Sequence, residues 1–140
     1  MPKIINGVTC RTREESLKHI IKQAKAGKIG PKGSEWSSGS CHYKYLSGNH
    51  CAVGCLFSAN QLKDIERRDF NSTSIAMVAQ EIGQKNIEAV TGMTVRELVK
   101  LQRLHDLAVE RCPGLGSVRT SIGKAVIDYC EKELAELANV

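Results

Sequence analysis

The chain has 140 residues, of which 41% are hydrophobic, 25% are charged and only 4% are aromatic. This balance is typical of a globular protein rather than a disordered one, and the scarcity of aromatic residues favours a helical core over a β-sandwich. No apolar run approaches the roughly 20 residues that a membrane-spanning helix needs, and the first residues lack the apolar stretch of a signal peptide. We therefore expect a single domain over residues 1–140, located in the cytoplasm without a membrane partner, with its six cysteines mostly reduced.

The net charge of +5 is concentrated near the N-terminus. Residues 1–50 hold nine Lys or Arg and three Glu, whereas residues 51–140 hold eleven Lys or Arg and twelve Asp or Glu. This distribution favours an anionic partner. A track for nucleic-acid phosphates would use the basic side chains Lys18, Lys22, Lys25, Lys28 and Lys32. The modest total charge makes nucleic acid the less favoured partner.

The first helix is predicted from Thr12, whose spacing from Glu15 is that of a capping box. Leu17 and Ile20 begin an apolar stripe at helical spacing, and Gly27 is a natural stop. Residues 28–40 are rich in Gly and Ser, so they predict a loop. This loop contains the only tryptophan of the chain, Trp36.

Residues 41–57 read CHYKYLSGNHCAVGCLF. The alternation over residues 41–46 predicts a short strand, and residues 47–50 supply turn chemistry. Residues 51–57 can then form either a returning strand or a helix. We expect a short β-hairpin here, and the small residues Cys51, Ala52, Gly54 and Cys55 would let it approach a helix closely.

The rest of the chain predicts helices. Ser58 and Thr94 open two more capping boxes, with helices to about Arg67 and Arg111. A helix from about residue 75 to Gly83 lies between them, and the last runs over residues 117–138 with Leu137 facing inward. Together the elements predict a compact, mainly α (α+β) fold of about five helices and one short β-hairpin.

The thiols and imidazoles of residues 41–57 leave two chemical alternatives open. Cys41, His50, Cys51 and Cys55 are zinc-compatible ligand types, although their spacing differs from that of the usual zinc knuckles. A cysteine-dependent hydrolase or transferase would use Cys51, acidified at a helix N-terminus, with His50 or His105 as its base. Ordinary packing of buried cysteines is the interpretation that we favour, so we expect no metal, no cofactor and no catalytic residue.

Two blocks carry a resemblance: C-x-Y followed by CAVGCL over residues 41–56, and LQRLHD over residues 101–106. They resemble a family of small, largely uncharacterised proteins encoded by bacteriophages and prophages, which share the pattern C-x-Y…G-x-x-C-A-[IV]-G-[AC]-L-I-P-D…L-Q-x-x-H-D. The resemblance covers roughly residues 14–108. Where the family has Pro-Asp this chain has Phe57-Ser58-Ala59-Asn60, so Ser58 can replace the acid as a helix cap but not in any catalytic role.

The resemblance implies an accessory viral protein acting in the cytosol of a bacterial host, and it implies no established reaction. It also suggests that the hairpin lies against the LQRLHD helix, held there by Gln102 and His105. We expect a non-enzymatic binding protein, of the kind that counters host defence, with an anionic nucleotide-like ligand or a host protein as its partner. Lysines and backbone amides suit phosphate, and aromatic faces suit a base. The candidate ligand-binding residues are Trp36, His42, Tyr43, Lys44, His50, Gln102, His105 and Asp106. A homodimer that joins the acidic end of the last helix to the lysines of the first is a further hypothesis.

Overall fold

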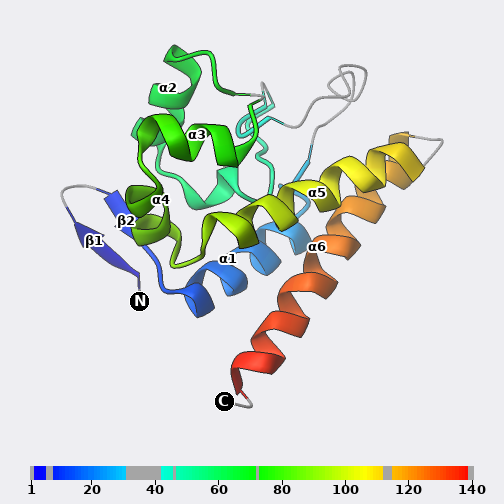
Figure 1. Ribbon diagram of the computed structural model, residues 1–140. Helices are drawn as coiled ribbons and strands as arrows, with labels where there is room; N and C mark the ends of the chain where they lie inside the picture. Colours follow the sequence, from blue (N-terminus) through cyan, green and yellow to red (C-terminus); the bar gives the residue numbers. More distant parts are fainter. Residues whose placement is uncertain are drawn as a thin grey trace.

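The computed structural model describes residues 2–5, 8–30, 42–45, 47–71, 73–111 and 115–138, and only the backbone of residues 105–111 and 115–122. Within these ranges the chain forms six α-helices and one two-stranded antiparallel sheet (Figure 1). The predicted fold class, a compact and mainly helical α+β fold, is confirmed.

The β-hairpin lies at the N-terminus. Strand β1 (Lys3–Ile5) pairs with β2 (Val8–Cys10), with Ile4 opposite Thr9. The sequence signal for it is the Asn-Gly dipeptide at positions 6 and 7, which typically marks a tight hairpin. The hairpin that we expected within residues 41–57 is wrong, because the described part of this segment forms isolated bridges instead of strands.

Three helices form the lower layer in Figure 1. They are α1 (Arg13–Lys25), α5 (Val95–Arg111) and α6 (Leu115–Ala138). Helix α6 packs against both α1 and α5. Arg13 joins all three helices, because its guanidinium donates hydrogen bonds of 2.6 Å to Glu97 on α5 and to Glu133 on α6. The inward placement of Leu137 is wrong, since this residue of the last turn of α6 is 38% exposed.

The shorter elements lie above this layer. They are the 3₁₀ turn η2 (Gly54–Leu56) and the helices α2 (Ala59–Arg67), α3 (Ile75–Ile82) and α4 (Gln84–Thr91). The capping boxes predicted at Thr12 and Ser58 are confirmed, each with both reciprocal hydrogen bonds. Residues 51–57 form neither a returning strand nor an α-helix, because only Gly54–Leu56 are helical, as the 3₁₀ turn η2.

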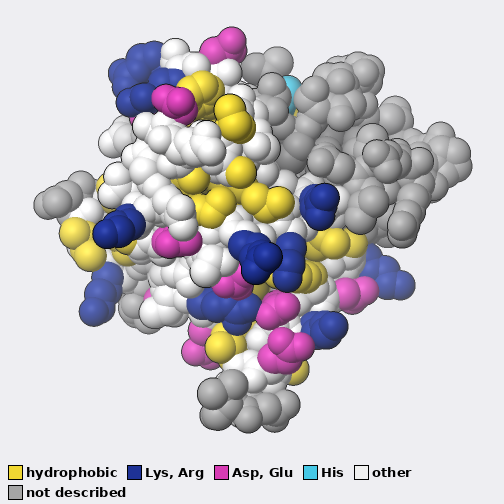
Figure 2. Space-filling model, viewed as in Figure 1, with side chains coloured by type: hydrophobic (Ala, Val, Ile, Leu, Met, Phe, Trp, Pro, Cys, Tyr) yellow, Lys and Arg dark blue, Asp and Glu magenta, His cyan; other side chains and the backbone are white. Residues whose placement is uncertain are grey.

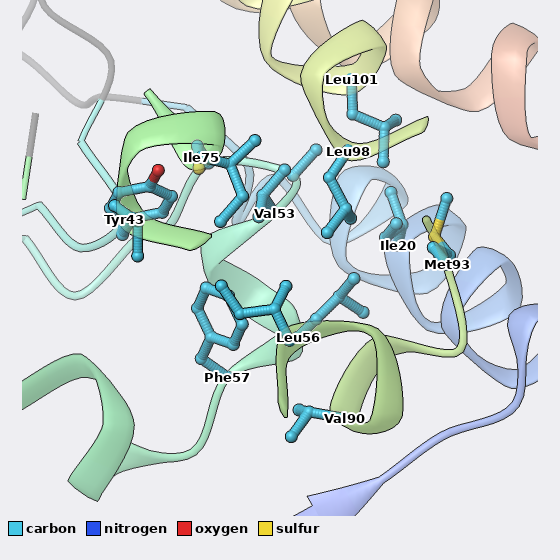
Figure 3. Close-up of a cluster of buried hydrophobic side chains, with 14 of the residues drawn as sticks. Ile20, Tyr43, Val53, Leu56, Phe57, Ile75, Val90, Met93, Leu98 and Leu101 are labelled. Carbon is cyan, nitrogen blue, oxygen red and sulfur yellow. The ribbon is translucent and has the colours of Figure 1, made fainter. Parts of the chain in front are cut away.

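One cluster of buried apolar side chains joins both layers (Figure 3). Leu17 and Ile20 come from α1, Leu98 and Leu101 from α5, and all four are 1% exposed or less. The segment around η2 lies in the middle of this cluster. Its side chains Val53 and Leu56 are fully buried, so residues 51–57 are core as well as connection.

Candidate ligand-binding site

Residues 42–45 and 47–51 belong to a loop that is fixed by backbone and side-chain hydrogen bonds. The amide of Tyr45 donates to the carbonyl of Asn49 at 2.8 Å, and the amide of Cys51 donates to the carbonyl of His42 at 3.2 Å. The side chain of Asn49 is buried and donates to the carbonyls of Gly27 and Gly30. The loop is therefore anchored to the segment that follows α1.

Tyr43 connects the loop to α3 and α5. Its ring is buried, and its hydroxyl donates to the carbonyl of Thr73 at 2.6 Å. The same hydroxyl accepts a 3.0 Å hydrogen bond from the Gln102 side-chain amide. The carbonyl oxygen of that amide accepts from the backbone N–H of Ile75 at 2.8 Å, which satisfies a donor at the start of α3. Gln102 thus contacts the loop, as expected, although through a side chain of the loop rather than its backbone.

Close packing of Gly54 on Tyr43 explains why small residues occur in CAVGC. A Cβ placed on Gly54 would lie 2.7 Å from the carbonyl carbon of Tyr43 and 2.8 Å from its Cα. Carbon atoms that are not bonded pack at about 3.5–4.0 Å. No side chain larger than hydrogen fits at this position unless the backbone moves.

The cysteines of this segment have the environment of packed thiols. Cys51 is 2% exposed, and its sulfur accepts a 3.2 Å hydrogen bond from the Gly54 amide. The thiol of Cys55 donates to the Ala52 carbonyl at 3.1 Å, and burial, with a smaller contribution from Cys51, raises the pKa of Cys55. Burial likewise raises the pKa of Cys130 to about 12. A raised pKa keeps a thiol protonated and poorly nucleophilic.

Two half-buried histidines lie near these thiols. Burial, together with the charge of Arg11, lowers the pKa of His19, and burial with the charge of Lys44 lowers the pKa of His50. His50 pairs with Lys44 through an antiparallel bridge. Both imidazoles are therefore mainly neutral at neutral pH, so they add hydrogen-bonding capacity rather than charge.

A pocket of about 370 Å³ opens between this loop and α2. Its lining residues are His42, Lys44, Tyr45, Glu66 and Asn71. Asn71 fixes Lys44, since its side-chain amide accepts from the Lys44 N–H at 3.1 Å and donates to the Lys44 carbonyl at 3.0 Å. The ring of His42 lies 5.2 Å from that of Tyr45, between centroids. The pocket thus offers one ammonium group, one carboxylate and an imidazole on a firmly held backbone.

The predicted site residues divide into three groups. His42 and Lys44 line the pocket. Tyr43 and Gln102 form the hydrogen-bond network that supports the loop, and His50 bridges to Lys44. The predicted residues Trp36, Cys41, and the side chains of His105 and Asp106 lie outside the described residues.

Three lining residues were missed by the sequence analysis: Tyr45, Glu66 and Asn71. Tyr45 belongs to the segment CHYKYL and lies beside Lys44, two positions after Tyr43. Its place in this segment could have identified it as a candidate binding residue. Glu66 and Asn71 lie on and just after α2, and their types do not distinguish them from other surface residues. Only the folded chain brings them to the loop.

The described geometry gives little support to the zinc-site hypothesis or to the nucleic-acid hypothesis. Among the described residues, no group of three or more His, Cys, Asp or Glu side chains is arranged to hold a metal ion. Two of the lysines proposed as a phosphate track are near carboxylates, Lys18 at 3.0 Å from Glu14 and Lys25 at 3.9 Å from Glu131. Figure 2 shows basic and acidic side chains interspersed where α1, α5 and α6 meet.

The pairing of Lys25 with Glu131 occurs within one chain. The homodimer proposed between the last helix and the first would have to compete with it. No described helix is both long enough and apolar enough to cross a membrane.

Comparisons of the chain with protein-family models, with curated proteins and with solved structures find no match.

Proposed function

We propose that this protein is a non-enzymatic, phage-type accessory protein that binds a small anionic ligand of nucleotide type in the pocket between residues 42–45 and α2. Its place of action would be the cytosol of a bacterial host, where sequestering such a ligand would counter host defence. The polar pocket, with the backbone of Lys44 held on its wall by Asn71, carries the proposal.

The lining supports a ligand with an anionic end and a hydrogen-bonding end. Lys44 is exposed and is the only cation in the described lining, so it would take a phosphate or carboxylate. The carboxylate of Glu66 would repel a second anionic group and would accept hydrogen bonds from the amino or hydroxyl groups of a base or ribose. A volume of about 370 Å³ falls within the usual range for small-molecule sites.

The side chain of His42 is expected to change its orientation when a ligand binds. Its Nδ1 atom is buried and has no hydrogen-bond partner among the described residues. An unpaired buried polar group costs about 1–3 kcal/mol. A turn of the His42 ring toward a bound ligand would remove this cost, so we expect the ring to reorient on binding.

The cysteine-enzyme alternative has less support. Cys51 is buried and its sulfur already accepts a hydrogen bond from a backbone amide. This environment suits a thiol that packs in the core rather than one that reacts, and the described lining of the pocket includes no cysteine.

A thermal-shift titration with mononucleotides, cyclic nucleotides and dinucleotides tests the proposal. A ligand at 100 times its Kd stabilises the folded state by about 2.7 kcal/mol, which gives a clear rise in Tm. The variant Lys44→Met should raise the Kd about tenfold or more, because hydrogen bonds to charged groups contribute about 1.5–3 kcal/mol.

Lys63→Met is the matched control. Lys63 is an exposed lysine of α2 that does not line the pocket, so its loss should leave the titration unchanged. If no nucleotide raises the Tm, or if the two variants weaken binding equally, the pocket is not a nucleotide site. A host protein would then be the remaining partner class.

A further inference from the structure

Strand β1 lies on the surface with apolar side chains facing solvent. All three of its residues are exposed, with Ile4 at 72% and Ile5 at 55%. Successive side chains of a strand point to opposite faces. Both faces of β1 are therefore open, which is unusual for two consecutive isoleucines.

The hairpin is held to the protein through its other strand. Val8 and Cys10 of β2 pack against the core, and the amide of Arg11 donates to the carbonyl of Val90 at 2.9 Å. Figure 1 shows β2 between β1 and α4, with β1 on the outside. Within the described residues, β1 pairs only with β2, so its outer edge is open. An open apolar edge is a template for another strand, and a two-stranded hairpin alone is only marginally stable in water.

We propose that β1 is an interface through which two copies of this chain pair, edge to edge and antiparallel, about a twofold axis at Ile4. The two hairpins would then form one continuous four-stranded sheet. The backbone groups that face outward on β1 alternate along the strand. Whether they belong to Ile4 or to its two neighbours, pairing centred on Ile4 joins equivalent groups, so the edge is self-complementary.

The charges of the strand favour the same arrangement. In a pairing centred on Ile4, Lys3 lies opposite Ile5 of the partner subunit rather than opposite a second lysine. Ile4 lies opposite the partner's Ile4, which gives an apolar contact on the axis. Like charges directly opposite one another destabilise a sheet, whereas apolar β-branched pairs stabilise it. A second copy of this chain is therefore a suitable occupant of the edge, and this inference does not depend on the proposed ligand.

Sedimentation velocity on the full chain, from about 1 µM to 1 mM, tests the inference across the range expected for a small interface. We expect a reversible monomer–dimer equilibrium. Ile4→Glu should raise the dimer dissociation constant about tenfold or more, because two carboxylates then face each other at the axis. Ile5→Glu should lower it or leave it unchanged, since this carboxylate would face the partner's Lys3.

An exchange experiment tests the symmetry. Ile4→Glu and Ile4→Lys should each remain mainly monomeric, while a mixture of the two should form a heterodimer. Met77→Glu is the matched control, because Met77 is 52% exposed on α3 and lies outside the strand. Circular dichroism establishes that each variant is folded. A wild-type protein that stays monomeric at about 1 mM, a dimer insensitive to Ile4→Glu, or a mixture that stays monomeric would each overturn the proposed interface.

Discussion

Replacement of Gly54 by alanine tests the packing of the CAVGC segment most directly. An added Cβ would lie 2.7 Å from the carbonyl carbon of Tyr43, so that backbone has to move by about 1 Å to reach normal carbon–carbon contact. The atoms that the Cβ would meet belong to the Tyr43 backbone, so no side-chain rotation relieves the overlap. Forcing extra volume into a packed core costs about 1–3 kcal/mol, and more when the surroundings are rigid.

The movement would also disturb the two hydrogen bonds of the Tyr43 hydroxyl, to Thr73 and from Gln102. Each contributes about 0.5–1.5 kcal/mol. We therefore expect Gly54→Ala to lower the free energy of unfolding by about 2–6 kcal/mol, a large part of the stability of a typical domain.

Urea denaturation followed by circular dichroism measures this difference, with the midpoint and the m-value fitted together. The control is Gly123→Ala in α6, where an added Cβ meets no atom of the described residues within 4 Å outside the adjoining turns of its own helix. That substitution should stabilise the protein by about 0.5–1 kcal/mol, since alanine has the higher helix propensity. A loss of less than about 1 kcal/mol for Gly54→Ala would refute the close approach of η2 to Tyr43.

The buried Tyr43, the two half-buried histidines and the partly buried thiol of Cys55 support three further predictions. Tyr43→Phe should cost about 1–3 kcal/mol in the urea assay, because it leaves two polar partners unpaired, whereas Tyr129→Phe should change little, since no hydrogen bond of that hydroxyl is present among the described residues. Burial lowers the pKa values of His19 and His50, so the unfolded chain binds protons more readily than the folded one. Stability should be full above about pH 7 and fall as the pH drops through about 6.5, the ordinary pKa of histidine, and replacing both by Gln should flatten this part of the curve. The raised pKa of Cys55 predicts alkylation by iodoacetamide at about pH 7 that is much slower in the native protein than in urea, as mass spectrometry of the labelled peptide would show.

Each outcome has a clear counterpart that would contradict it. Equal losses for the two tyrosine variants would mean that the hydroxyl of Tyr43 is not the link between the loop and α5. A stability that is constant between about pH 7 and 5 would contradict the burial of the two imidazoles. Rapid labelling of Cys55 in the native state would contradict the packed, protonated environment of this thiol.

Local signals in the sequence were sufficient for five of the six described α-helices, whereas α4 (Gln84–Thr91) was not predicted. Each capping box is a contact between residues three apart, such as Ser58 with Gln61, and it forms whatever the rest of the chain does. The apolar stripe through Leu17 and Ile20 likewise states which face of α1 is buried. The mainly helical fold and the bounds of most helices could therefore be read from the sequence.

The hairpin and the pocket show what only the tertiary structure decided. Residues 42–45 look like a strand, yet both backbone hydrogen-bonding groups of Lys44 pair with the side chain of Asn71, 27 positions further along the chain. Glu66 lines the pocket because α2 lies near residues 42–45 in the folded chain, and no local sequence pattern around Glu66 predicts this placement. Sequence patterns report interactions within about one helical turn or one strand pair, whereas a binding site depends on distant segments that the core brings together.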